Sequence, residues 1–239
     1  MLFEFGIGSR VVGVTDYCVH PADQVADLPK IGGTKNANAA SILELAPDLV
    51  IANKEENRPP LVAAMEEAGV PILVTDARSV ERAVAEIALL GRATACESEA
   101  AGLVMRINRE LERLSDLVDR PRVPVVTLIW KGPYMVVGGD TYADDLLARC
   151  GASNPFAGAE GRYPRVREGD LEASAPEVIL LPSEPYAFGE QDRLELLGLE
   201  CPASRSSQVH LVEGELLSWY GPRIVRALRE LPALVAPSL

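Results

Sequence analysis

Short apolar runs that alternate with helical patterns restrict this chain to the α/β class. In the first half, the apolar runs lie at residues 10–14, 48–53 and 71–76. In the second half, they lie at residues 123–130, 134–139, 177–182 and 208–214. Strands separated by helices at this spacing predict parallel sheets whose faces are covered by the helices.

Local signals mark where several of the helices begin and end. Asn38 is a suitable N-cap for a helix that Pro47 stops, and Gly69 follows a helix that starts with two prolines. Further helical patterns occupy residues 79–92, 140–151 and 221–231. These helices lie between the predicted strands, as parallel pairing requires.

One long helix is predicted between the two halves, over residues 98–120. This segment has no proline, and its apolar residues recur every three or four positions, at Leu103, Val104, Ile107, Leu111, Leu114 and Leu117. A helix of about 20 residues is roughly 30 Å long, which is enough to run along two small lobes. We expect an N-terminal α/β lobe at residues 1–96, a linking helix at 97–120 and a C-terminal α/β lobe at 121–239.

Charge and composition disfavour several classes of function. The formal net charge is −12, whereas a nucleic-acid surface needs clustered Lys and Arg. No apolar stretch approaches the roughly 18 residues of a membrane span. The first ten residues lack the features of a signal peptide, so we expect a cytoplasmic protein whose four Cys are reduced.

The common catalytic and cofactor motifs do not occur in the sequence, which has no P-loop, G-x-S-x-G, G-x-G-x-x-G or H-E-x-x-H. Gly138 and Gly139 precede a helical pattern, as in a phosphate cradle. However, Asp140, Asp144 and Asp145 would repel phosphate there. We interpret these aspartates as structural residues of the helix start.

Cys18 and His20 are spaced so that both could bind one metal ion or form a Cys–His pair. A structural metal site needs two more ligands, and the other histidine of the chain, His210, is distant in sequence. The sequence identifies no third group that would orient a nucleophilic pair. A metal site, a nucleophile and the edge of a ligand pocket are therefore the alternatives for these two residues.

Most of the large aromatic residues follow predicted strands. They are Tyr17, Trp130, Tyr134, Tyr186, Phe188, Trp219 and Tyr220. Ligands bind at the carboxyl ends of strands in open α/β sheets, and large flat ligands favour aromatic walls. Core packing is the alternative for each aromatic residue, and we expect it for about half of them. As a set, they indicate a ligand cleft between two lobes.

Three segments, in order around the long helix, carry a resemblance to a known family. They are LAPDLVIA at 45–52, GGDTYADDLLARCG at 138–151 and SWYGPR at 218–223. The chain resembles the helical-backbone metal receptor superfamily over essentially its whole length. These are the class III periplasmic binding proteins, which include vitamin B12- and iron-siderophore-binding proteins of ABC importers, and the chain is similar to a signal-less branch. The resemblance implies two Rossmann-like lobes with parallel sheets, joined by one long rigid helix, and a ligand in the cleft between them.

The resemblance also implies ligand-binding residues. In the B12-binding members, a Tyr after the first strand and an aromatic pair in the last βα loop line the site, and Tyr17 and Trp219–Tyr220 stand there. The full candidate set is Tyr17, Cys18, His20, Lys35, Trp130, Tyr134, Tyr186, Trp219 and Tyr220. His20 could reach a metal inside the ligand, because a neutral imidazole is a good axial ligand for cobalt or haem iron.

The chain departs from the importer pattern in three places. A signal peptide is absent, so a periplasmic location is expected only if an upstream start adds one. The Glu residues that dock the transporter would fall near Ala40 and Gly169, with Glu44, Glu168 or Asp170 as substitutes. The opening strand of the family is also missing, and we expect the native start to lie upstream of the first residue.

These observations predict a non-enzymatic, monomeric protein that has no intrinsic cofactor and binds a metal-containing ligand, with a corrinoid such as cobalamin favoured. A siderophore or haem is the alternative ligand. The other classes are a cytoplasmic enzyme or chaperone that acts on a corrinoid, with Cys18 or His20 at its metal, and an interaction protein with an empty cleft. The expected partners are the small metal complex and an ABC transporter permease, and not nucleic acid.

Overall fold

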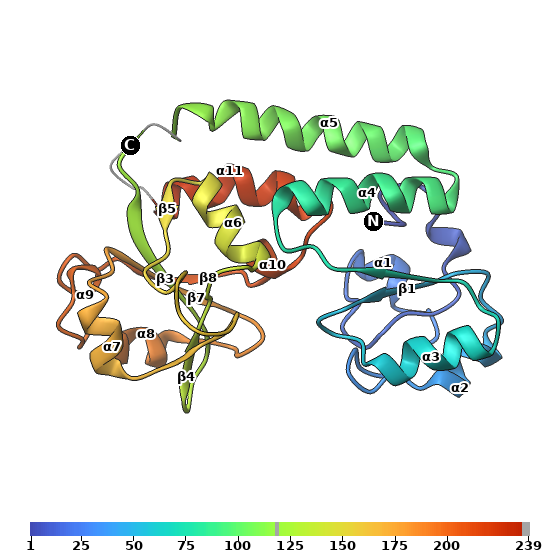
Figure 1. The fold of residues 1–239 in the computed structure, drawn as a ribbon, viewed down its shortest axis with the longest axis horizontal. Coiled ribbons are helices and arrows are strands. Elements are labelled where there is room, and N and C mark those ends of the chain that lie inside the picture. The colour runs from blue at the N-terminus through green and yellow to red at the C-terminus, as the bar shows by residue number, and fades with distance from the viewer. Residues whose placement is uncertain (118–119, 236–239) are drawn as a thin grey trace. The chain divides into compact units, whose positions relative to one another are not determined.

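The structure is a computed structural model that describes residues 1–117 and 120–235. The chain divides into two compact units. Figure 1 labels the helices and strands that make up these units. Unit 1 comprises residues 1–76 and 88–101, and unit 2 comprises residues 77–87 and 102–239. The lobe boundaries expected at residues 96 and 120 stay predictions. Residues 118–119 of the expected linking helix and 236–239 of the expected C-terminal lobe lie outside the described residues.

Unit 1 contains a two-stranded parallel sheet and short helices. The strands are β1 (Val50–Asn53) and β2 (Ile72–Thr75), which pair in register from Val50–Ile72 to Asn53–Thr75. The helical elements are η1 (Gly8–Arg10), α1 (Ala22–Val25), α2 (Ala39–Glu44) and α3 (Pro59–Glu67). The core of this unit includes the buried side chains of Phe5, Val25, Ile42 and Met65.

The predicted helix ends of unit 1 are confirmed. Asn38 caps α2, because its Oδ1 atom accepts hydrogen bonds from the N–H groups of Ala40 and Ser41, at 2.9 and 3.3 Å. The two prolines of α3 occupy its first turn, where their missing N–H groups leave no helical hydrogen bond unmade. Gly69 follows α3 with a φ of 71°, a left-handed conformation that suits glycine.

The prediction of a strand at residues 10–14 is wrong. Val14 makes only an isolated parallel bridge to Lys30. The Val14 N–H donates to Pro29 O at 3.0 Å, and the Val14 carbonyl accepts from Ile31 N–H at 3.1 Å. An apolar run becomes a strand only where a partner backbone runs beside it, and here the pairing extends over a single position.

Two long helices, α4 (Val80–Thr94) and α5 (Glu97–Arg113), follow β2 in the sequence, and each has residues in both units. α5 ends at Arg113, short of the predicted end at residue 120, and the 3-10 helix η2 (Ser115–Leu117) follows it. The Leu114 N–H donates to both Glu110 O and Leu111 O, which marks the change from α to 3-10 geometry. Within residues 1–117 and 120–235, no helix is both long and apolar enough to cross a membrane.

Unit 2 is built around one six-stranded sheet. Its strands are β3 (Val123–Trp130), β4 (Tyr134–Val136), β5 (Ala152–Ser153), β6 (Arg165–Val166), β7 (Val178–Pro182) and β8 (Val209–Val212). Besides parts of α4 and α5, its helices are α6 (Tyr142–Arg149), α7 (Glu168–Ala173), α8 (Glu190–Leu196), α9 (Pro202–Arg205), α10 (Glu215–Ser218) and α11 (Arg223–Val235).

The sheet of unit 2 is mixed. The strand order is β6-β4-β3-β7-β8, with β5 paired to β3. β3 pairs in parallel with β7, and β7 with β8, as the predicted parallel sheet requires. β3 also pairs in parallel with β5, a strand that the sequence analysis did not predict. β4 pairs antiparallel with β3 and β6, so the parallel sheet also carries an antiparallel edge that the sequence analysis did not predict. The cause is the short connection at residues 131–133, because parallel strands need a crossover of about a dozen residues or more.

Helices cover both faces of this sheet, with α7, α8 and α9 on one side and α6, α10 and α11 on the other (Figure 1). On the first side, Leu171 of α7 and Leu196 of α8 belong to one buried cluster with Ile179 of β7. Leu146 of α6 and Leu228 of α11 are fully buried as well. The predicted α/β architecture is therefore confirmed.

Candidate functional site

The carboxyl ends of β3, β7 and β8 lie at one edge of the unit 2 sheet, because these strands are parallel neighbours. The strands end at Trp130, Pro182 and Val212. Ligands bind at this edge in open α/β sheets. We therefore define the carboxyl-edge site as Trp130 together with residues 131–133, 183–189 and 213–222.

Three aromatic side chains meet at the carboxyl-edge site. The ring centroids of Trp130 and Tyr186 are 5.7 Å apart with an interplanar angle of 71°, and those of Tyr186 and Phe188 are 4.7 Å apart. Phe188 is buried in the core, whereas Trp130 is 43% exposed. We call these three residues the aromatic cluster. It presents an aromatic surface that is fixed to the core at one end and open to solvent at the other.

Lys131 is a residue of this site that the sequence analysis did not identify. Its Nζ atom donates to Asp192 Oδ1 at 2.6 Å and to Glu195 Oε2 at 2.5 Å. These hydrogen bonds raise the pKa of Lys131 and lower the pKa of each carboxyl group. Asp192 Oδ2 also accepts from the Gly189 N–H at 2.9 Å, at the start of α8. Lys131 thus ties the segment after β3 to α8.

The other predicted residues of unit 2 make contacts of different kinds. Tyr134 of β4 packs half-buried against the core, and this burial raises its pKa. Tyr220 packs edge-on against the buried Tyr142, with ring centroids 5.9 Å apart. Trp219 lies against the guanidinium group of Arg223. Core packing, the alternative considered for individual aromatic residues, thus applies at least in part to Tyr134 and Tyr220.

Three predicted ligand-binding residues, Tyr17, Cys18 and His20, lie near the start of unit 1, in the segment after Val14. Tyr17 is 65% exposed, and His20 is exposed as well. The half-buried Cys18 thiol lies 3.3 Å from the hydroxyl oxygen of Thr15. Among the residues that the structure describes, no group of three or more His, Cys, Asp or Glu is placed to hold a metal ion. A contact from His20 to a metal inside a ligand stays a prediction.

Lys35 lies at a hollow on unit 1 with a volume of about 280 Å³. The hollow is lined by Thr34, Lys35, Ala37, Ala39, Arg58, Pro60 and Leu61. The Thr34 hydroxyl donates to Glu56 Oε2 at 2.8 Å, which fixes one side of it. Two exposed cations beside apolar side chains suit a ligand that carries both a negative group and an apolar surface.

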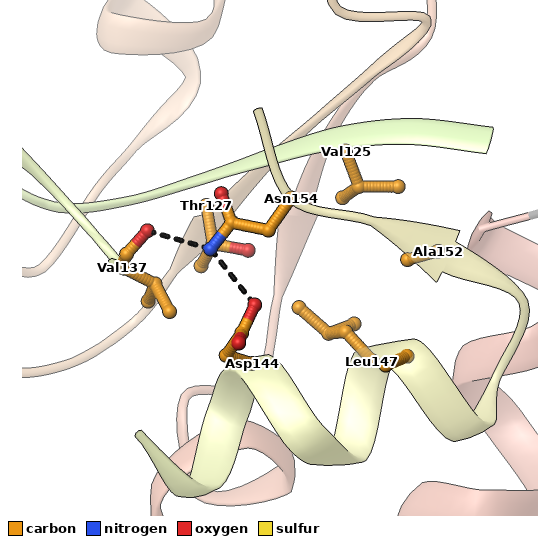
Figure 2. A pocket seen from close by; sticks show the side chains of 8 residues that line it. Val125, Thr127, Val137, Asp144, Leu147, Ala152 and Asn154 are labelled. Carbon is orange, nitrogen blue, oxygen red and sulfur yellow. Dashed lines mark hydrogen bonds between the residues drawn. The ribbon is translucent and has the colours of Figure 1, made fainter. Parts of the chain in front are cut away.

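A cavity inside unit 2, between α6 and the strands β3 and β5, is not suited to such a ligand (Figure 2). The Asn154 Nδ2 atom donates to Val137 O at 3.1 Å and to Asp144 Oδ1 at 2.9 Å, and the buried Thr127 also lines the cavity. The volume of about 10 Å³ is close to that needed for one water molecule. This cavity is therefore too small for a cofactor or an organic ligand.

The aspartates at the start of α6 have structural roles, as the sequence predicted. Thr141 Oγ1 accepts from the Asp144 N–H at 3.2 Å and caps the helix. Asp145 Oδ2 accepts from Arg149 Nε at 2.8 Å. Asp140 is paired with an arginine that precedes α4, at 2.6 Å. These carboxylates therefore take part in contacts with other groups of unit 2.

Comparisons with known proteins identify related sequences. The family described as "Periplasmic binding protein" matches residues 1–194. The uncharacterized ABC transporter substrate-binding lipoprotein YvrC of Bacillus subtilis (strain 168) is 24% identical, over 98% of this chain and 76% of its own length. The vitamin B12-binding protein of Vibrio parahaemolyticus serotype O3:K6 (strain RIMD 2210633) is 22% identical, over 96% of this chain and 82% of its own length.

Solved structures share the fold of the whole chain. The periplasmic heme-binding protein RhuT from Roseiflexus sp. RS-1, in its apo form, has a TM-score of 0.82 and 25% identity, over 99% of this chain and 93% of RhuT. The periplasmic heme-binding protein BhuT, in complex with two hemes, has a TM-score of 0.80 and 27% identity, over 95% of this chain and 90% of BhuT. These matches confirm the predicted two-lobe binding-protein fold.

Proposed function

Because this chain belongs to the periplasmic binding protein family, we propose that it binds a metal-containing tetrapyrrole and does not change it chemically. The observation that carries this proposal is the aromatic cluster of Trp130, Tyr186 and Phe188 at the carboxyl-edge site. Flat conjugated ligands bind well against aromatic side chains with a few fixed polar groups nearby. An ABC transporter permease is the proposed protein partner.

Two ligands of this class each have specific support. Cobalamin is supported by the vitamin B12-binding relative, which aligns with 96% of the chain. Haem is supported by RhuT and BhuT, whose identities of 25% and 27% extend over nearly the whole chain. An iron siderophore is the alternative outside the tetrapyrroles.

Candidate ligand contacts are proposed for each unit separately. In unit 1, we propose Tyr17, because the resemblance assigns it and because most of its side chain is exposed. In unit 2, we propose Trp130, Tyr186 and Trp219, with the buried Phe188 supporting Tyr186 from the core. Burying an aromatic face against a ligand contributes on the order of 1–3 kcal/mol, so an alanine at either Tyr17 or Trp219 is expected to weaken binding roughly tenfold.

Co-elution tests the proposed function. The purified protein is mixed with cyanocobalamin, hemin or a ferric hydroxamate siderophore and passed over a gel-filtration column, and visible spectra are recorded across the protein peak. We expect cyanocobalamin or hemin to elute with the protein. Elution of both cyanocobalamin and hemin apart from the protein would overturn the proposal, and co-elution of the siderophore alone would support the alternative ligand. Mass spectrometry of the released ligand decides between a binding protein, which returns it unchanged, and an enzyme, which does not.

His20 gives a spectroscopic prediction under this proposal. If its imidazole binds the metal of the ligand, His20→Ala will shift the visible bands of the complex as well as lower its affinity, because the axial ligand sets the spectrum. The matched control is His210→Ala, since His210 bonds to Gln208 within unit 2. An unshifted spectrum in the His20 variant would show that His20 does not bind the metal. It would not contradict the proposed ligand-binding function of the protein.

A further inference from the structure

Trp219 is held by a short segment between two helices. It is the C-cap of α10, and its N–H donates to Glu215 O at 3.1 Å. Gly221 has a φ of 113°, and α11 begins two residues later at Arg223. The backbone around Trp219 is therefore fixed by both helices, while the backbone alone does not determine where the indole ring points.

The side chain of Arg223 lies over the Trp219 ring. Its guanidinium carbon lies 5.3 Å from the centroid of the Trp219 ring. The Arg223 Nη2 atom forms an ion pair with the carboxylate of Glu215, and the two side chains are only 24% and 19% exposed. The pair joins the first residue of α10 to the first residue of α11 and holds the guanidinium group near the ring. A planar cation in this position stacks on an indole face.

The next arginines of α11 make contacts of a different kind. Arg226 pairs with Glu213 and Glu230, and Arg229 pairs with Glu110. These pairs join carboxylates to guanidinium groups as ordinary helix-surface and helix-helix contacts do. Arg223 differs because its guanidinium lies against both a carboxylate and the aromatic ring of a proposed ligand contact.

We propose that Arg223 is a positioning residue, which covers one face of the Trp219 indole and thereby presents the opposite face to the ligand. The inference rests on the proposed function in that it takes Trp219 as a ligand contact. Glu215 acts through Arg223, because its carboxylate holds the guanidinium over the ring. The indole is thus oriented before the ligand arrives, which lowers the entropic cost of binding.

The test measures the fluorescence of Trp219 itself. The chain has two tryptophans, so Trp130→Phe leaves Trp219 as the single one. In this background, acrylamide quenching and fluorescence anisotropy are measured without ligand for Arg223→Met, Arg223→Lys and the control Arg226→Met. Affinities for hemin and cyanocobalamin are then compared within the same background.

Arg223→Met is expected to increase quenching of Trp219 and lower its anisotropy, because one indole face loses its cover. It should also weaken binding of the better ligand by about three- to tenfold, which corresponds to the loss of one cation–π contact. Arg223→Lys should recover part of both effects, because an ammonium group keeps the charge but not the planar stack. Arg226→Met should change neither.

Two results would overturn the inference. The first is unchanged quenching and anisotropy in Arg223→Met, which would show that the ring is held without the guanidinium. The second is an equal change in Arg226→Met, which would indicate a general loss of α11 structure. If the wild type and the Trp130→Phe parent both fail to bind hemin and cyanocobalamin, the proposed function fails. The ligand-free fluorescence then still decides whether Arg223 orients Trp219.

Discussion

At the scale of single residues, Lys131 connects the carboxyl-edge site to α8 through two ion pairs. Its ammonium group holds Asp192, whose side chain is nearly buried, and Glu195, which is more exposed. Lys131→Met would leave the Asp192 carboxylate without its cation. We expect the free energy of unfolding at pH 7 to fall by about 1–3 kcal/mol, since the pair is buried only in part. Urea unfolding measures this change.

The pH dependence of this loss follows from the lowered pKa of Asp192. A carboxyl group with a lowered folded pKa contributes stability above its unfolded pKa of about 3.9, and this contribution disappears as the pH falls through the folded value. The difference between wild type and Lys131→Met should therefore shrink below about pH 4. The control is Lys54→Met, whose exposed pair with Asp76 is worth at most about 1 kcal/mol. Equal losses in the two variants would contradict this role of Lys131.

The backbone at Ala157 approaches Gly139 so closely that a side chain at position 139 would clash with it. A Cβ atom at this position would overlap the carbonyl oxygen of Ala157, which is backbone and cannot move aside easily. Gly139→Ala should lower the free energy of unfolding by about 1–3 kcal/mol. Gly169→Ala in α7 meets open space and should stabilise the protein by up to about 1 kcal/mol, because Ala favours helix. A Gly139→Ala protein as stable as wild type in urea would refute this explanation.

Residues with local partners could be predicted from the sequence, and residues with distant partners could not. The Asn38 cap bonds to groups two and three residues ahead, so its role is visible in a short window. Lys131 bonds to residues 61 and 64 positions later, which no local pattern indicates. The position of Trp130 at a strand end was predictable, whereas its packing against Tyr186 depends on the pairing of β3 with β7.

At the scale of elements, a buried carboxylate joins α5 to α11. Glu110 accepts from Arg229 Nε at 2.7 Å and from Arg113 Nε at 2.9 Å, although only 6% of its side chain is exposed. Arg113 Nη2 also donates to Leu228 O at 2.8 Å. Glu110→Gln keeps the shape but removes the charge, so we expect a loss of about 1–2 kcal/mol in the free energy of unfolding at pH 7.

Hydrogen bonds from Arg229 and then Arg113 lower the pKa of Glu110. Its stabilising contribution is therefore complete above about pH 4.3 and is lost as the pH falls through the lower folded pKa. Wild type and Glu110→Gln should become alike in urea unfolding at acidic pH. Glu230→Gln, which removes an exposed partner of Arg226, is the control and should cost less than about 1 kcal/mol. A pH-independent difference for Glu110→Gln would contradict the charge-based explanation.

The elements that the sequence predicted well are those with strong internal patterns. α4 and β3 match their predicted segments closely, because long periodic or continuous apolar runs identify an element without reference to its neighbours. The run at residues 10–14 failed because a strand also requires a partner. The short helices α8 and α10 have few residues with which to show a helical period, so the sequence analysis did not predict them.

At the scale of the whole molecule, the family and fold were predictable, and the ligand was not. The fold depends on apolar patterns spread along the entire chain, and the family match over residues 1–194 confirms it. We propose that ligand identity depends on a few side chains at strand ends, with Trp130, Tyr186 and Trp219 as the candidates in this chain. Changes at such positions leave the core intact, so one fold accommodates different ligands.

Isothermal titration of the full chain with hemin and with cyanocobalamin tests the central claim most directly. The wild type, Tyr186→Ala and Tyr163→Ala are compared, since Tyr163 is an exposed tyrosine of unit 2 outside the carboxyl-edge site. We predict saturable binding of one of the two ligands, about tenfold weaker in Tyr186→Ala and unchanged in Tyr163→Ala. Absence of saturable heat with both ligands, or wild-type affinity in Tyr186→Ala, would contradict a tetrapyrrole site built on the aromatic cluster.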